Sequence, residues 1–148
     1  MTCLVRGGPN NSFAWKRNGE VISGENENQL TLMNFNTSSG GIYTCTVSNA
    51  AGSGSASTTL YVLPFIVTPL EEQILTMNGS YMNISCDADG FPNPTVNWVD
   101  MTNAEVVSTS LLEFSPVMFG DEGLYRCVAT AEINNMNFNA TDDIILVG

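Results

Sequence analysis

The sequence lacks histidine altogether and has only four lysines and arginines. Histidine is the usual general base and a common transition-metal ligand, so most hydrolase triads and most zinc sites are excluded. A formal net charge of −11 argues against nucleic-acid binding, which needs clusters of basic side chains. The cysteines are not clustered, so there is no CxxC metal or redox signature. We therefore expect no catalytic residues, no metal site and no cofactor.

Long hydrophobic runs are also missing. No apolar segment approaches the roughly 20 residues that span a bilayer, so we expect no direct membrane insertion by this segment. The first residues carry no apolar signal segment. The 148 residues are 43% hydrophobic, which suffices for one domain or two small ones and is not typical of a disordered or fibrous chain.

Two halves of the sequence carry the same spaced set of residues. Each set holds a cysteine, a tryptophan 12 residues later, and a tyrosine two residues before a second cysteine. The first set is Cys3, Trp15, Tyr43 and Cys45, and the second is Cys86, Trp98, Tyr125 and Cys127. The offset of 82–83 residues has the size of a domain, so we predict an internal repeat of two domains.

Short alternating segments surround these residues. Tyr43 and Cys45, like Tyr125 and Cys127, alternate with residues that face the other way, which places tyrosine and cysteine on one buried strand face. Clusters of Gly, Pro, Asn and Ser separate the segments, and no useful helical periodicity is present. We predict an all-β chain of two antiparallel β-sandwiches in series.

The spacing of cysteine, tryptophan, tyrosine and cysteine resembles the immunoglobulin superfamily. Residues 121–127 (DEGLYRC) match the family pattern D-x-G-x-Y-x-C in full, whereas residues 39–45 (SGGIYTC) have Ser39 in place of the aspartate. Residues 90–94 (GFPNP) and 49–52 (NAAG) look like the intermediate, or I-set, type. The resemblance implies two tandem immunoglobulin-like domains from a cell-surface receptor or adhesion-type protein.

The resemblance also assigns a structural core. Trp15 and Trp98 would each pack against an inter-sheet disulfide, and Tyr43 and Tyr125 would form tyrosine corners, whose hydroxyl groups bond back to the backbone. The core positions expected in strand E are Leu30, Leu32 and Phe35 in the first unit, and Leu112, Phe114 and Val117 in the second.

Four cysteines allow three disulfide connectivities. The repeat selects Cys3–Cys45 and Cys86–Cys127, since each pair lies inside one unit with its own tryptophan. Disulfides imply an oxidising compartment. The alternative is that the cysteines are reduced and buried, as in I-set modules of intracellular muscle proteins.

The domain boundary is predicted near Leu63–Pro64, which gives domain 1 over residues 1–63 and domain 2 over residues 64–148. Domain 1 begins directly in strand B at Cys3, so we expect it to be N-terminally truncated, without strand A, in a fragment of a longer chain. An unpaired sheet edge is a liability, which favours this interpretation over a complete domain.

Charge divides sharply at this boundary. Residues 1–63 have no net charge, whereas residues 64–148 hold Arg126 and twelve acidic residues. A solvated acidic surface explains this, and a docking face for a basic partner or for calcium is the alternative. Because Arg126 points away from the core, we expect Asp121 to bind backbone amides of its own turn.

Five sequons predict N-glycosylation sites on a secreted protein. Their asparagines are Asn10, Asn36, Asn78, Asn83 and Asn139.

The segment between the last two strands of domain 2 is longer than its counterpart in domain 1, and we predict a binding loop there. Its candidate residues are Asn134, Asn135, Met136 and Phe138. The alternative is a tight turn at Asn134–Asn135 with both apolar side chains packed on their own sheet. Strand alternation turns Asp142 inward, so we also predict a β-bulge that shifts the register.

The resemblance implies a non-catalytic extracellular recognition module that serves cell adhesion or ligand binding by a receptor ectodomain. Its partner would be a protein ligand, another cell-surface protein or a second copy of itself. A parent chain of receptor type leaves room for a cytoplasmic kinase domain. The alternative function is a structural or scaffolding module of an intracellular filament-type protein. Fold-level resemblance does not select a ligand.

Overall fold

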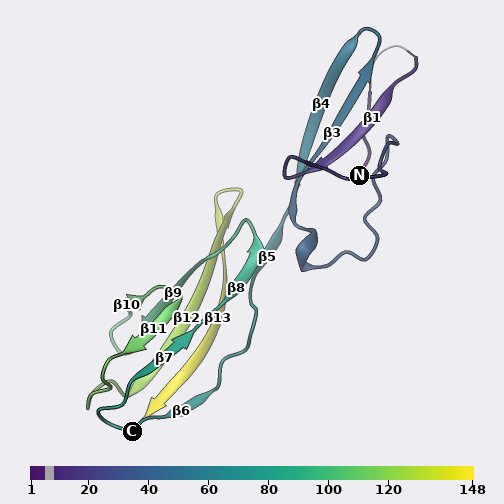
Figure 1. Ribbon diagram of the computed structural model, residues 1–148. Coiled ribbons are helices and arrows are strands. Elements are labelled where there is room, and N and C mark those ends of the chain that lie inside the picture. The colour runs from purple at the N-terminus through teal and green to yellow at the C-terminus, as the bar shows by residue number, and fades with distance from the viewer. Residues whose placement is uncertain (6–8) are drawn as a thin grey trace. The chain divides into compact units, whose positions relative to one another are not determined.

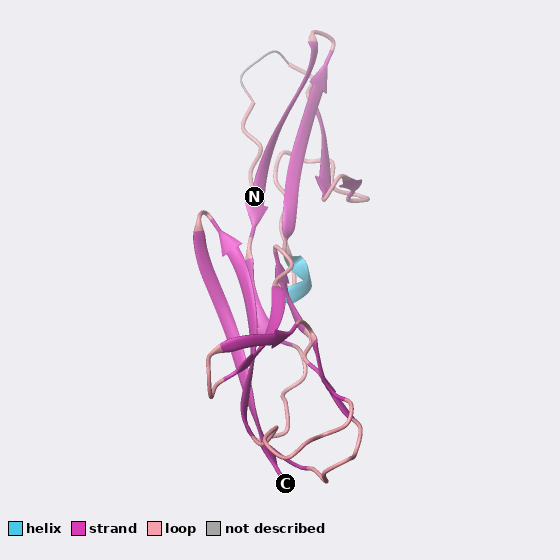
Figure 2. Ribbon diagram, turned by 90° about the vertical axis from the view of Figure 1, so that its left-hand side faces the viewer, coloured by secondary structure: helices cyan, strands magenta, loops and turns pink. Residues whose placement is uncertain are grey.

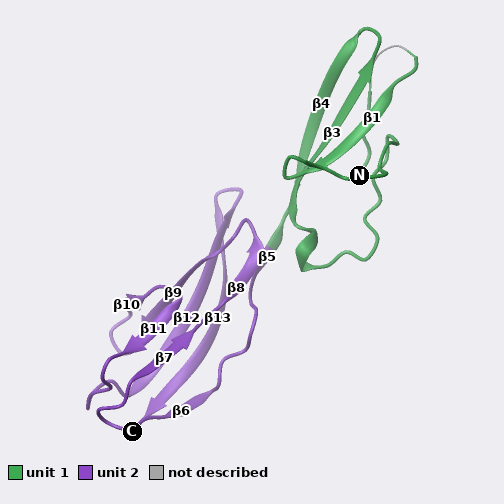
Figure 3. Cartoon of the chain, in the orientation of Figure 1, with its two compact units in different colours: residues 1–62 green, residues 63–148 purple. Residues whose placement is uncertain are grey.

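The regular secondary structure of the described residues is almost entirely β-strand (Figure 1, Figure 2). The computed structural model describes residues 1–5 and 9–148. Within these residues the one helical element is η1, a 3₁₀ turn over Thr37–Ser39. The chain divides into two compact units, Met1–Val62 and Leu63–Gly148 (Figure 3). This all-β, antiparallel class is the one predicted from the sequence.

Unit 1 contains a four-stranded antiparallel sheet in the order β2-β1-β3-β4. Its strands are β1 (Ser12–Arg17), β2 (Glu20–Val21), β3 (Gly41–Asn49) and β4 (Gly52–Leu60). Trp15 of β1 lies directly opposite Cys45 of β3. The alternation of β3 buries Tyr43 and Cys45 on one face, as period two requires.

The layer facing this sheet is irregular in unit 1. A single bridge joins Thr2 to Gln29, flanked by the bonds from Cys3 N to Asn28 O and from Leu30 N to Met1 O. Beside the cysteines lies a hollow of about 260 Å³ whose lining includes Trp15 and residues 56–58 of β4. Most residues of β4 are exposed.

One core prediction for unit 1 is wrong. Leu30 is buried and Leu32 is half-buried, but Phe35 is 60% exposed. No strand forms around these residues in the described structure. Asn34 adopts a positive φ of 56° and turns the chain toward η1, which breaks the strand alternation that would carry Phe35 inward.

Unit 2 has two facing β layers. One is a five-stranded sheet in the order β10-β9-β12-β13-β6, and the other consists of the pairs β11–β7 and β5–β8. The strands of the first layer are β6 (Gln73–Leu75), β9 (Thr95–Asp100), β10 (Glu105–Ser108), β12 (Gly123–Ile133) and β13 (Met136–Val147). Those of the second are β5 (Val62–Ile66), β7 (Met82–Ser85), β8 (Ala88–Phe91) and β11 (Leu111–Phe114).

The core of unit 2 lies between these layers. Trp98, Leu112 and Ile144 are buried together with Cys86 and Cys127. On the strand-E positions, Leu112 and Val117 are buried and Phe114 packs edge-on against Tyr125, with ring centroids 5.5 Å apart. β6 runs parallel to β13 and pairs with its outer edge, so the short strand β6 forms the edge of the sheet on this side.

The predicted β-bulge near Asp142 is absent. β12 and β13 pair without interruption from Gly123–Leu146 to Ile133–Met136, and Asp142 lies opposite Cys127 on the inner side. The carboxylate is only half-buried and accepts a hydrogen bond from the Leu70 amide at 2.7 Å. Because this partner satisfies the carboxylate, the register has no need to shift.

Candidate functional site

One disulfide closes the core of each unit. Cys3 is bonded to Cys45 with 6.2 Å between their Cα atoms, and Cys86 is bonded to Cys127 with 6.4 Å. Both Cα separations lie within the usual range for a disulfide. Each bond joins the strand that carries the tyrosine to the opposite layer, so it holds the two sides of the core together.

The two tryptophans occupy matching places. Trp15 Nε1 donates to the Glu27 carbonyl at 2.9 Å, and Trp98 Nε1 donates to the Ser110 carbonyl at 3.3 Å. Both indoles are almost fully buried, so these bonds satisfy donors that have no access to water. In each case the acceptor lies 12 residues after the tryptophan. The two units therefore share this core hydrogen bond as well as the spacing of their cysteines and tryptophans.

The tyrosines also form equivalent contacts. Tyr43 Oη donates to the Ser39 carbonyl at 2.7 Å, and Tyr125 Oη donates to the Asp121 carbonyl at 2.9 Å. Burial raises the pKa of Tyr125, and the negative charges of Asp100 and Asp121 raise it further. The phenol is therefore held as a neutral donor.

The turn before Tyr125 agrees with the sequence-based expectation for Asp121. Its carboxylate accepts the Met118 amide at 2.7 Å, a contact within its own turn. Ser39 occupies the matching position of unit 1, and its hydroxyl oxygen accepts a hydrogen bond from the backbone N–H of Asn36 at 3.1 Å. Serine thus fulfils part of the aspartate's role because both side chains offer an oxygen to a local backbone donor.

The candidate binding residues form a hairpin end rather than a loop. β12 and β13 remain paired up to Ile133–Met136, and the turn contains only Asn134 and Asn135, with φ values of 53° and 62°. Two consecutive positive φ values are typical of a type I′ turn. Met136 is 58% exposed, whereas Phe138 is half-buried opposite Ala131. The extra sequence lengthens the strands.

An ion pair on the outer face of this hairpin was missed in the sequence. The Arg126 guanidinium donates from Nε and Nη2 to the two carboxylate oxygens of Asp143, at 2.7 and 2.8 Å. These bonds lower the pKa of Asp143 and raise that of Arg126. The register of the two strands places Arg126 directly opposite Asp143, and sequence alone did not specify that register.

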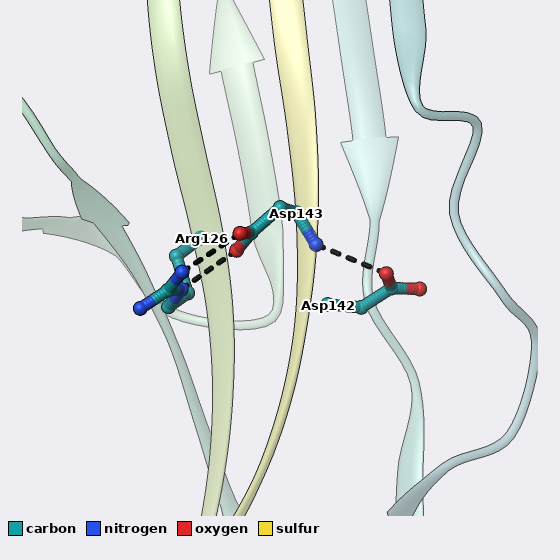
Figure 4. Close-up of polar contacts among 3 residues, drawn as sticks. All are labelled: Arg126, Asp142 and Asp143. Atoms are coloured by element: carbon teal, nitrogen blue, oxygen red, sulfur yellow. Dashed lines mark hydrogen bonds and ion pairs between the residues drawn. The ribbon is translucent and has the colours of Figure 1, made fainter.

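Asp142 and Asp143 therefore have different roles. Figure 4 shows Arg126 and Asp142 on opposite sides of β13, as strand alternation demands. Asp142 anchors residue 70 of the segment before β6, whereas Asp143 neutralises the one basic side chain of unit 2. The outer face of β12 and β13 consequently has a neutral centre on an acidic unit.

The five sequon asparagines are all exposed. Asn36 caps η1, because its side-chain oxygen accepts the Ser38 amide at 3.0 Å. Asn83 lies on the outer side of β7, and Asn139 lies on β13 opposite Thr130.

Within residues 1–5 and 9–148, no group of three or more His, Cys, Asp or Glu side chains is placed to hold a metal ion. None of the helical segments there has the length and apolar character to cross a membrane.

Known proteins share this architecture. A family model of the immunoglobulin domain matches residues 1–49 and 64–131. The human netrin receptor DCC is 30% identical over 156 residues, and the match covers 95% of this chain and 11% of the receptor. The chain therefore spans about a tenth of the length of that relative.

Solved structures with low sequence identity have the same fold. The first eight immunoglobulin domains of Down Syndrome Cell Adhesion Molecule, isoform 1.30.30, superpose with a TM-score of 0.57 at 24% identity, covering all of this chain and 24% of that one. The titin I-band fragment I67–I69 superposes with a TM-score of 0.52 at 21% identity, covering 95% of this chain and 56% of the fragment.

Proposed function

This chain belongs to the immunoglobulin domain family, and from that premise we propose that it is a non-catalytic extracellular recognition module of receptor or adhesion type. The observation that carries the proposal is the disulfide across the core of each unit. Disulfides persist in oxidising compartments and are rare in the cytosol. The likeness to a netrin receptor over 95% of the chain supports the same conclusion.

The partner is proposed to be a protein: a soluble ligand, another cell-surface protein or a second copy of this chain. Paired strands present flat, polar outer faces and hairpin ends, which suit contact with another folded surface. Since the chain spans 11% of the receptor's length, the parent protein's ligand is not carried over from that receptor.

The proposed contact surface is the end of the β12–β13 hairpin in unit 2. Met136 is exposed beside the Asn134–Asn135 turn, and methionine is a flexible apolar side chain that adapts to a partner. The continuous pairing of β12 with β13 holds this end in a fixed geometry. A preorganised contact costs less conformational entropy on binding than a mobile loop does.

A thiol and glycan measurement tests the compartment. The parent protein is isolated from the cells that make it, and the mass of the segment is measured before and after reduction and glycosidase treatment. We expect four cysteines without free thiols and at least one occupied sequon. Free thiols together with unmodified sequons would instead support a scaffolding module of an intracellular filament.

A binding measurement tests the surface. A multimeric form of the chain is used to stain a panel of cells, and sedimentation velocity measures self-association. We expect Met136→Asp to abolish whichever interaction is found. The matched control is Leu75→Asp, because Leu75 is exposed but lies on β6 at the sheet edge. Equal loss of binding in both variants would refute the assignment of the hairpin end.

A further inference from the structure

An exposed apolar patch surrounds the Asn78 sequon in unit 2. Met77, Tyr81, Met118 and Phe119 are between 58% and 83% exposed. They come from two segments, the one between β6 and β7 and the one between β11 and β12. Both segments lie at the end of unit 2 where the C-terminus lies (Figure 1). We call these four residues the apolar patch.

Backbone hydrogen bonds hold the two segments together. Gly79 N donates to Val117 O at 2.8 Å, and Val117 N donates to Ser80 O at 2.7 Å. On the second segment, the Met118 amide is fixed by the Asp121 carboxylate. The four apolar residues therefore lie on two segments whose backbones are hydrogen-bonded to each other. Large exposed apolar side chains gathered in one region of a surface often mark a place that is covered in the functional protein.

The turn presents the asparagine at its tip. Ser80 N donates to Met77 O at 3.0 Å, which closes a four-residue turn with Asn78 and Gly79 at its centre. Gly79 has a φ of 85°, the conformation that the third position of a type II turn requires. Asn78 is exposed, and its amide makes no hydrogen bond to another described residue. Its Nδ2 atom is accordingly available for reaction.

We propose that an N-linked glycan on Asn78 covers the apolar patch and keeps this end of unit 2 from self-association. The inference rests on the proposed extracellular function. The sequon sits within the patch, with Met77 immediately before it and Tyr81 immediately after it. The apolar C–H faces of the first sugars pack on the aromatic and methionine side chains, while the hydroxyl groups face water.

The attachment is an ordinary group transfer. Nδ2 of Asn78 forms a bond to C1 of the first N-acetylglucosamine of an oligosaccharide carried on a lipid diphosphate. The C1–O bond to the diphosphate breaks, the lipid diphosphate leaves with the bonding electrons, and Nδ2 gives up one proton to a base of the transferase. Ser80 supplies the hydroxyl that completes the acceptor sequence.

Two different substitutions remove the glycan. Asn78→Gln changes the acceptor, whereas Ser80→Ala destroys the sequon and leaves Asn78 in place. The matched control is Ser85→Ala, which removes the Asn83 sequon on β7, where Asn83 lies opposite Glu113. The full chain is secreted from mammalian cells, and glycopeptide mass spectrometry measures occupancy at each sequon.

The readouts are the fluorescence of an apolar-surface dye and the sedimentation coefficient. We expect Asn78 to be occupied, and both Asn78→Gln and Ser80→Ala to raise dye fluorescence several-fold and to promote self-association. Ser85→Ala should change neither. Adding Phe119→Ser to Asn78→Gln should reverse most of the increase, because Phe119 has the highest exposed fraction of the four patch residues.

The possible failures differ from one another. An unoccupied Asn78 in a chain glycosylated elsewhere would overturn this inference and leave the proposed function standing, as would an occupied Asn78 whose removal changes neither readout. A chain with no occupied sequon and with free thiols would overturn the proposed function as well.

Discussion

At the scale of single residues, adjacent aspartates on one strand do different things. Asp142 faces inward and accepts the Leu70 amide, whereas Asp143 faces outward and pairs with Arg126. Strand alternation causes this division, since neighbours on a strand point to opposite faces. The role of each carboxylate therefore depends on what stands opposite it in the other layer or on the next strand.

Asp142 is expected to stabilise unit 2 through the Leu70 amide. Asp142→Ala leaves that amide without its acceptor and should lower the free energy of unfolding by about 1–3 kcal/mol. Asp142→Asn keeps an acceptor oxygen and should cost less. Glu132→Ala is the control, because it removes one exposed carboxylate from β12. Calorimetry of the full chain measures the free energy of unfolding. Equal values for the Asp142→Ala and Glu132→Ala variants would contradict the stabilising role of Asp142.

The Arg126–Asp143 pair should make stability depend on pH. The pKa of Asp143 is lower in the folded state than in the unfolded state, so its contribution is present above the unfolded pKa and is lost as pH falls through the folded pKa. We expect Asp143→Asn to be slightly less stable than the parent at neutral pH, because each partner is about one-third exposed.

The difference between the parent and Asp143→Asn should shrink as pH falls through the folded pKa of Asp143, because the carboxylate is then protonated in both states. Denaturant titrations at neutral pH and across the acid range provide the measurement. A stability difference that persisted unchanged in acid would mean that the ion pair is not its source.

At the scale of elements, the β12–β13 hairpin is defined by its turn. Asn134 and Asn135 both adopt positive φ, which asparagine tolerates better than most residues. This turn allows the strands to stay paired to their ends, with Met136 exposed and Phe138 turned toward the sheet.

Substitutions at Asn135 should separate turn geometry from side-chain chemistry. Asn135→Gly suits a φ of 62° and should leave the hairpin intact. Asn135→Val forces a β-branched residue into this conformation and should destabilise the hairpin by about 1–2 kcal/mol. Hydrogen exchange at the amides of the hairpin end measures the local effect. Equal protection in the Gly and Val variants would argue against a turn that requires positive φ.

At the scale of the whole molecule, the two units have unequal cores. Unit 2 has two layers, and β6 covers the edge of β13. Among the described residues of unit 1, the facing layer contains one bridge, and a hollow of about 260 Å³ lies beside the disulfide. Apolar burial is the main favourable term in folding, so unit 1 should be the less stable unit.

Native-state hydrogen exchange on the full chain tests this inequality. The strands β3 and β12 are compared because each lies inside its unit's sheet. We expect the buried amides of β3 to exchange through openings of lower free energy than those of β12, since unit 1 has the weaker core. Reduction of both disulfides should lower the protection of both strands by a similar amount, since each closes a loop of about 40 residues and contributes roughly 3–4 kcal/mol. Equal protection of β3 and β12 before reduction would show that the irregular layer does not weaken unit 1.

The sequence alone was sufficient for the class and for the central frame. The spacing of cysteine, tryptophan and tyrosine is a local signal repeated twice, and the structure forms the same two disulfides and places both tryptophans in the cores. This spacing predicts the core residues because side chains along a strand alternate between its two faces with a period of two. The turn contact of Asp121 was predictable because it is local, since it joins residues three apart.

Only the tertiary structure decided the contacts between distant segments. Phe35 lies outside the core because a turn at Asn34 interrupts the strand alternation. No bulge forms at Asp142, because the backbone amide of Leu70, 72 residues away in sequence, donates a hydrogen bond to its carboxylate. The pairing of Arg126 with Asp143 followed from the register of two strands, which the sequence did not specify. Local alternation fixes which face a side chain takes, but the partner on that face depends on how separate segments are brought together in space.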